Sequence, residues 1–108
     1  MNEFFDHVLK LCEQHNIAVY IHPECRPCSF PPIRQINIHP VKSVEDYCVA
    51  LHEIGHVILG HLPEQDRMEK ETSAWWWAIN NALEWDIEHT EFLAKCLALW
   101  EEECKLTP

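Results

Sequence analysis

Two histidines four residues apart, with a glutamate directly after the first, form the pattern His52-Glu53-Ile54-Gly55-His56. Residues four apart on a helix lie on one face, so both imidazoles can bind one metal ion. Zinc accepts histidine nitrogens and carboxylate oxygens, and a catalytic zinc keeps three protein ligands and a water. Glu53 lies about 100° round the helix from His52, where it can take a proton from the zinc-bound water. The pattern predicts a catalytic zinc site with His52 and His56 as ligands and Glu53 as the general base.

A catalytic zinc needs a third protein ligand, and the spacing leaves several candidates open. Glu71 is the best of them, because the helix that carries it should run back antiparallel to the first helix after a short turn. Glu69 and Glu84 are weaker alternatives. His61 lies about 140° round the helix from His56. We therefore interpret His61 as a surface histidine at the end of that helix.

The segment around the motif carries the signals of a helix with defined ends. Ser43 is an N-cap residue, and Asp46 three residues later forms a weak capping box with it. Gly60 suits the position after the C-cap, and Pro63 prevents continuation. Apolar residues recur at helical spacing on one face: Val44, Tyr47, Cys48, Leu51, Ile54, Gly55 and Ile58. The pattern predicts one helix between Ser43 and Gly60.

The first part of the chain predicts one helix and two strands. Residues 3–15 form an amphipathic helix with Asn2 as its N-cap. The β-branched and aromatic content of residues 17–21 predicts a strand. Residues 34–39 alternate apolar and polar side chains, which indicates a second strand, for which an edge position is one option. The four prolines between residues 22 and 32 predict an irregular loop.

The last part of the chain predicts two further helices. One spans about residues 68–83; its three consecutive tryptophans, Trp75 to Trp77, cover about 200° of the helix, so we expect two in the core and one partly exposed. Thr90 is the expected N-cap of the last helix, which ends near Cys104. The core side of that helix comprises Phe92, Leu93, Cys96, Leu97, Leu99 and Trp100. The order α-β-β-α-α-α predicts an α+β fold with a small sheet, in a single domain over residues 1–108.

The composition restricts partners and compartment. The formal net charge is −10, from 18 acidic and 8 basic residues. Such a surface repels a phosphate backbone, so we expect neither nucleic-acid nor membrane binding, and a basic peptide is easier to reconcile with the charge. The N-terminus lacks the regions of a signal peptide, and no apolar run is long enough to span a bilayer. We therefore expect a cytoplasmic protein.

Six cysteines are present, and in a reducing compartment we expect free, mostly buried thiols. Cys25 and Cys28 form a CxxC motif in the proline-rich loop, with His22 before it and His39 after it. These four residues could hold a second, structural zinc ion. A single CxxC without a second pair is a weak signal, so we favour an ordinary loop with free thiols and keep the second metal as the alternative.

Three segments resemble the ImmA/IrrE family of phage- and mobile-element-associated zinc metallopeptidases. They lie within about residues 36–80 and read Ile36-Asn37-Ile38, Ala50-Leu51-His52-Glu53-Ile54-Gly55-His56 and Glu71-Thr72-Ser73-Ala74-Trp75-Trp76-Trp77-Ala78. The last resembles the family's E-x-x-A pattern, which implies Glu71 as the third ligand. The resemblance also implies a minimal, gluzincin-like zincin domain. Related gluzincins often carry Asp where this chain has Trp75, so the support that Asp gives a ligand histidine is missing.

These expectations combine into one functional hypothesis. Members of such families often cleave a repressor-like or antitoxin-like regulator, so the resemblance implies a zinc-dependent metallopeptidase acting on a specific regulatory protein. His52, His56 and Glu71 would hold one catalytic Zn²⁺, and Glu53 would act as the base. The alternative is a zinc-containing phage or mobile-element protein that binds or regulates a partner with little or no peptidase activity. The intact Glu53 speaks against it, because a structural zinc site does not need a base.

Overall fold

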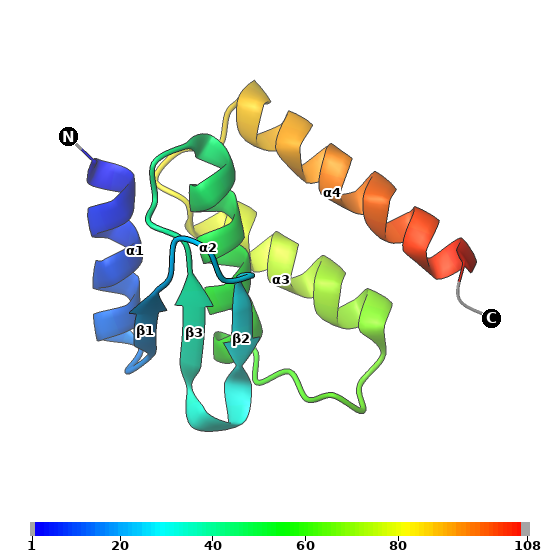
Figure 1. Cartoon of the computed structure of the whole chain (residues 1–108), viewed down its shortest axis with the longest axis horizontal. Helices are drawn as coiled ribbons and strands as arrows, with labels where there is room; N and C mark the ends of the chain where they lie inside the picture. The colour runs from blue at the N-terminus through cyan, green and yellow to red at the C-terminus, as the bar shows by residue number, and fades with distance from the viewer. Residues whose placement is uncertain (1, 107–108) are drawn as a thin grey trace.

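The computed structural model describes residues 2–106, with side chains described for residues 2–99. This part of the chain has the predicted α+β class: four α-helices and a mixed sheet of three strands (Figure 1). The elements are α1 (Glu3–Gln14), β1 (Ala18–Ile21), β2 (Cys28–Phe30), the 3₁₀ turn η1 (Pro31–Ile33), β3 (Gln35–Ile38), α2 (Val44–Ile58), α3 (Arg67–Asn81) and α4 (Ile87–Leu106). No helix within residues 2–106 combines the length and apolarity needed to cross a membrane.

β3 is the central strand of the sheet, whose order is β1-β3-β2. β1 pairs parallel to β3, with Ala18 opposite Gln35, and β2 pairs antiparallel to it, with Phe30 opposite Gln35. The edge position considered for β3 is therefore wrong, because β2 lies where the prolines predicted a loop. Pro27 and Pro31 stand immediately before and after β2, so no proline interrupts its three residues.

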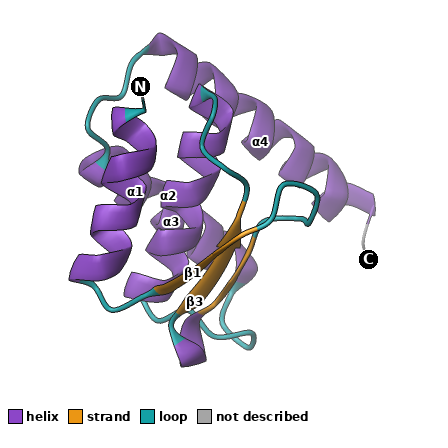
Figure 2. Ribbon diagram, turned by 60° about the vertical axis from the view of Figure 1, so that its left-hand side comes forward, coloured by secondary structure: helices purple, strands orange, loops and turns teal. Residues whose placement is uncertain are grey.

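α2 lies between the sheet and α3 (Figure 2). In β3, Ile36 and Ile38 are buried while the residues between and before them are half-buried, as expected for a strand with one covered face. The buried residues of α2 extend from Tyr47 to Val57 and occupy more than one side of the helix. α2 is thus the central element of the core, and its two histidines lie within this buried stretch.

Two of the predicted helix starts are confirmed by side-chain caps. Asn2 Oδ1 accepts the N–H of Phe5 at 3.1 Å, and Ser43 Oγ accepts the N–H of Asp46 at 3.1 Å. Asp46 does not complete a capping box, because its carboxylate accepts the N–H of Lys42 instead, at 3.0 Å. The start of α2, and hence the orientation of its histidines, is therefore fixed by local interactions.

α4 begins before its predicted start. The Asp86 carboxylate accepts the backbone N–H groups two and three residues later, at 3.0 and 3.4 Å, so Asp86 is the N-cap and Thr90 is not. Four of the predicted core residues do pack against the core: Phe92, Leu93, Cys96 and Leu97. Leu99 is 67% exposed, because α4 projects away from the other helices toward its C-terminal end (Figure 1). The side chain of Trp100 lies outside the described residues.

The five cysteines with described side chains are free. Cys12 and Cys48 are buried, as expected, and Cys28 and Cys96 are half-buried. Cys25 is exposed in the loop before β2, so the prediction that most thiols are buried holds only for the two on α1 and α2.

The two central helices are in close contact at Gly55 of α2. A Cβ atom added to Gly55 would lie 2.9 Å from the carbonyl oxygen of Ala74 and 3.3 Å from its Cα. Both atoms belong to the backbone of α3, so neither can rotate out of the way. Glycine is therefore required at this position for α3 to lie against α2.

We expect Gly55→Ala to destabilise the protein by up to about 2 kcal/mol. Alanine is favoured over glycine in a helix by about 1 kcal/mol. Overpacking a core costs about 1–3 kcal/mol, and here the added methyl group would have to displace the backbone of Ala74. Urea unfolding followed by circular dichroism measures the difference. Thr72→Ala, at an exposed position of α3, is the control for a substitution by alanine away from the contact, and it also removes the hydrogen bond from Thr72 Oγ1 to the carbonyl of Met68. A Gly55→Ala protein more stable than wild type would contradict the close contact.

Candidate metal centre

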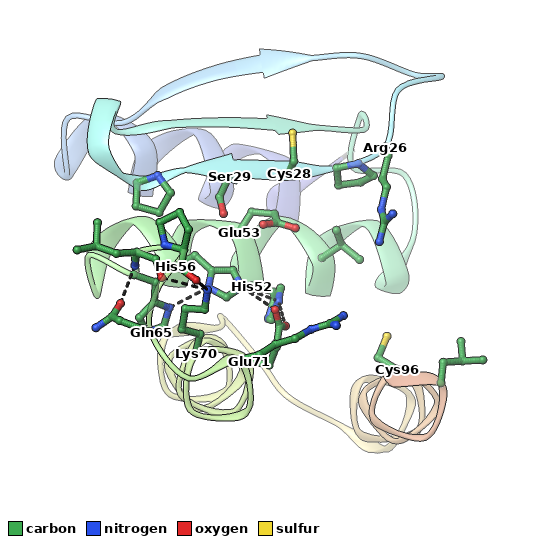
Figure 3. Close-up of a pocket in the computed structure, with 18 residues that line it drawn as sticks. Arg26, Cys28, Ser29, His52, Glu53, His56, Gln65, Lys70, Glu71 and Cys96 are labelled. Carbon is green, nitrogen blue, oxygen red and sulfur yellow. Dashed lines mark hydrogen bonds and ion pairs between the residues drawn. The ribbon is translucent and has the colours of Figure 1, made fainter. Parts of the chain in front are cut away.

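Three side chains from two helices converge at one point (Figure 3). His52 and His56 of α2 lie one turn apart, with their Nε2 atoms 3.0 Å from each other. The carboxylate of Glu71, on α3, lies 2.8 Å from His52 Nε2 and 3.5 Å from His56 Nε2. One ligand atom from each residue lies within 4.8 Å of the other two. Both histidines are buried and Glu71 is partly buried.

The atoms of this cluster fit a cation. Carboxylate oxygens accept hydrogen bonds, and two Nε2 atoms at hydrogen-bond distance can share only one proton between them. A divalent metal satisfies all three lone pairs at once, and two imidazole nitrogens with one carboxylate form a donor set that zinc accepts. Burial by itself raises the pKa of Glu71, but hydrogen bonds from His52 and His56 outweigh it and lower the pKa. Glu71 is thus held in the anionic form that a metal requires.

Of the candidates for the third ligand, the structure brings Glu71 to the two histidines. Glu69 and Glu84 are exposed and belong to no such group. His61 lies next to His56 but is not among the three converging ligands. Within the described part of the chain, the cluster of His52, His56 and Glu71 is the one group of metal-binding residues close enough to hold an ion.

The structure does not gather the four residues considered for a second metal. Cys25, Cys28, His22 and His39 form no group with metal-binding distances in the described part of the chain. His39 Nε2 instead lies 2.7 Å from the backbone carbonyl of Cys25, an interaction that ties the loop before β2 to the end of β3. The CxxC segment therefore serves as an ordinary loop with free thiols.

His61 contacts a ligand histidine, and its interpretation as a surface residue is wrong. His61 Nδ1 lies 2.8 Å from His56 Nδ1, and His61 Nε2 lies 3.1 Å from Ser73 Oγ. With Nε2 of His56 facing the cluster, His56 Nδ1–H donates to His61, and His61 Nε2–H donates to Ser73. The Ser73 hydroxyl then donates to the carbonyl of Glu69. Burial, with the neighbouring His56, lowers the pKa of His61 and favours the neutral ring that this chain of hydrogen bonds requires.

The C-terminal end of α2 explains the position of His61. Gly60 has a φ of +66°, and the N–H groups of Gly60 and His61 donate to the carbonyls of Val57 and His56 at 3.0 and 3.1 Å. This is a Schellman motif, which turns the chain back over the last turn of the helix. The angle of about 140° between His56 and His61 applies only to a helix that continues as far as residue 61. The predicted stop at Gly60 was the signal that could have placed His61 beside His56.

His52 is held by a different kind of contact. Its ring lies over Trp75, with ring centroids 4.2 Å apart and an angle of 30° between the planes. Its Nδ1 atom is buried and has no hydrogen-bond partner among the described residues. Trp75 occupies the position at which the resemblance would place a supporting Asp, so no carboxylate from that position reaches His52 Nδ1. The prediction for the three tryptophans is confirmed: Trp75 is buried, Trp77 is half-buried and Trp76 is 68% exposed.

Glu53 lies beside the cluster and faces β2 (Figure 3). Burial raises the pKa of Glu53, while His52, His56 and a hydrogen bond with the Ser29 side chain partly offset that effect. A raised pKa makes the carboxylate a stronger base. The sequence analysis missed Ser29, because β2 was not predicted and a lone serine in a proline-rich segment carries no signal of its own.

The cluster opens into a cleft of about 1050 Å³. Its walls come from β2 and the loop before it, from α2, from the loop between α2 and α3, from α3 and from the distal part of α4. Pockets that bind drug-sized ligands have volumes of about 300–1000 Å³, so the cleft has room for a short segment of peptide.

Comparison of the chain with protein-family models, with curated proteins and with solved structures finds no significant match. The resemblance to the ImmA/IrrE family therefore stays a prediction.

We expect the protein to bind one equivalent of zinc, and His56→Ala and Glu71→Gln each to lose it, because two ligands do not hold a catalytic zinc ion. Mass spectrometry of the native protein and competition with a chromogenic chelator measure the stoichiometry and the affinity. Glu69→Gln and Glu84→Gln remove the same charge outside the cluster and should keep the metal. Retention of zinc by Glu71→Gln would show that the cluster is not the binding site.

Loss of the His61 ring should weaken zinc binding by about 10- to 100-fold, the usual effect of removing a partner of a ligand histidine. His61→Ala leaves His56 Nδ1 without its acceptor, whereas His61→Asn offers an amide oxygen near the position of the lost nitrogen. Chelator competition should therefore rank wild type first, His61→Asn second and His61→Ala last. Equal affinities in all three proteins would mean that His61 does not support His56.

Proposed function

We propose that this protein is a zinc-dependent metallopeptidase with a zincin-like domain that hydrolyses a peptide bond in a protein substrate. The observation that carries the proposal is the convergence of His52, His56 and Glu71 within 4.8 Å, with Glu53 on the wall of the same cleft. A site that only held zinc would not need this fourth residue. The three segments that resemble the ImmA/IrrE family support the proposal and point to a regulatory protein as the substrate.

The residues of the cleft divide the chemistry between them. Zinc bound by His52, His56 and Glu71 would polarise the scissile carbonyl and acidify water in the cleft. Glu53 removes a proton from the attacking water and then gives it to the leaving amine. The Glu53 carboxylate faces Ser29 (Figure 3), and its raised pKa suits a group that must both accept and donate a proton.

The position of Glu53 on α2 explains why it takes this role and is not a ligand. It follows His52 directly, so its side chain points about 100° away from that histidine round the helix axis. Its carboxylate faces Ser29 of β2, whereas the imidazoles face α3 (Figure 3). Glu53 is therefore free to exchange protons beside the metal ligands.

A second candidate is a zinc-containing protein that binds a partner without cleaving it. The buried Nδ1 atom of His52 favours this alternative, because ligand histidines commonly donate that N–H to a carboxylate, a carbonyl or water. The position of Glu53 on the wall of the same cleft favours the peptidase, since a binding protein has no use for a base beside its zinc. Activity distinguishes the two functions.

Replacing Glu53 by glutamine should lower peptide hydrolysis by about 100-fold or more, the usual contribution of a general acid–base group, and leave the zinc content unchanged. New peptide termini are counted by mass spectrometry after a peptide mixture is incubated with zinc-loaded protein. Glu45→Gln, at an exposed position of the same helix, is the matched control. Undiminished hydrolysis by the Glu53 variant would refute the mechanism. A zinc-loaded wild type that cleaves nothing would favour the binding protein.

A further inference from the structure

The charge of the cleft differs in sign from that of the whole chain. The chain carries a formal net charge of −10 and contains 8 lysines and arginines. Three of these line the cleft: Arg26, Arg67 and Lys70. The acidic residues among those that line it are Glu53 and Glu71, which the proposed mechanism already uses. Among the described residues that line the cleft, the remaining charged groups, histidines apart, are all positive.

Arg26 and Lys70 lie on opposite walls. Arg26 belongs to the loop before β2 and lies on the sheet side of the cluster, whereas Lys70 directly precedes Glu71 on α3 (Figure 3). Arg26 makes no hydrogen bond or ion pair with the described residues. The Lys70 ammonium donates to the backbone carbonyls of Leu62 and Pro63 at 3.0 and 3.5 Å. No carboxylate of the described part of the chain neutralises either cation.

We propose that the cleft selects a peptide segment carrying aspartate or glutamate close to the scissile bond, with Arg26 and Lys70 as the groups that contact these carboxylates. The inference rests on the proposed function, because it concerns the substrate of the same cleft. Arginine suits this role, since its planar guanidinium can donate two parallel hydrogen bonds to one carboxylate. A lysine or arginine of the substrate would meet like charge at both walls.

The acidic surface does not prevent this selection. At physiological ionic strength the Debye length is about 8 Å, so charges on the far surface are screened from the cleft while Arg26 and Lys70 act at contact distance. An acidic segment is repelled over most of the surface and attracted at the cleft, a contrast that directs it to the site. The basic peptide expected from the net charge would instead bind the outer surface.

The test uses a mixture of short peptides from a digested, denatured proteome, which contains acidic, neutral and basic sequences. One measurement identifies new termini produced by the zinc-loaded wild type. The other identifies peptides retained by immobilised, zinc-loaded Glu53→Gln protein, which reports binding without cleavage. We expect aspartate and glutamate to be enriched beside the new termini and in the retained peptides. Higher salt should reduce the enrichment, because screening weakens exposed ion pairs.

Variants assign the preference to the two cations. Arg26→Gln alone, and Arg26→Gln with Lys70→Gln, should reduce the acidic enrichment by roughly 1.5-fold to 5-fold for each charge removed, the range of partly exposed ion pairs. Lys10→Gln with Lys42→Gln removes two charges outside the cleft and should leave the enrichment unchanged. Because Arg26 contributes no hydrogen bond or ion pair to the described fold, its single variant stays informative if the double variant misfolds.

Each outcome separates this inference from the peptidase proposal. Cleavage without acidic preference, or with a preference that survives in both variants, overturns the inference and leaves the peptidase standing. Retention of acidic peptides without cleavage supports the inference and overturns the peptidase. If neither cleavage nor selective retention is observed, both the inference and the peptidase proposal are overturned.

Discussion

The close approach of α2 and α3 is the constraint on which the metal cluster depends. His52 and His56 lie together because one helical turn separates them, but Glu71 belongs to another helix. Its carboxylate reaches the imidazoles because Gly55, between the two histidines, lets the backbone of Ala74 come near; an added Cβ would lie 2.9 Å from it. Ala74 follows Glu71 by three residues, so the contact that packs the core also sets the geometry of the ligands.

The two ligand histidines are fixed by different physical means. His56 is oriented by a directed chain of hydrogen bonds through His61 to Ser73, which specifies both its tautomer and its ring angle. His52 is oriented by contact with the ring of Trp75, which fixes the plane of the imidazole but offers its Nδ1 no acceptor. A hydrogen bond raises the basicity of a ligand, whereas stacking only positions it. The two histidines would therefore differ in how well they are supported as metal ligands.

The parts of the fold that could be predicted are those whose signals are local. Caps, apolar spacing and a glycine stop define α2 within one stretch of sequence, so its bounds and its buried face follow from the residues themselves. β2 has three residues and no alternation to detect, and the strand exists because β3 offers it a partner. The N-cap of α4 was misplaced because both Asp86 and Thr90 are good caps. Tertiary packing, not propensity, chose between them, with His89 buried and hydrogen-bonded to Asp86.

The residues of the candidate site could likewise be predicted where their signals are local. The histidine pair and Glu53 share one helix and could be read from spacing, and Glu71 followed from the expected antiparallel helix. Ser29 and Arg26 come from a segment distant in sequence from the histidine pair, and the net charge of the chain does not tell where its individual charges lie. Partly burying two carboxylates in one cleft is costly unless cations lie near them. Three of the eight lysines and arginines of this acidic chain line the cleft beside its two half-buried acids, and their charge makes the cleft complementary to acids while the surface repels them.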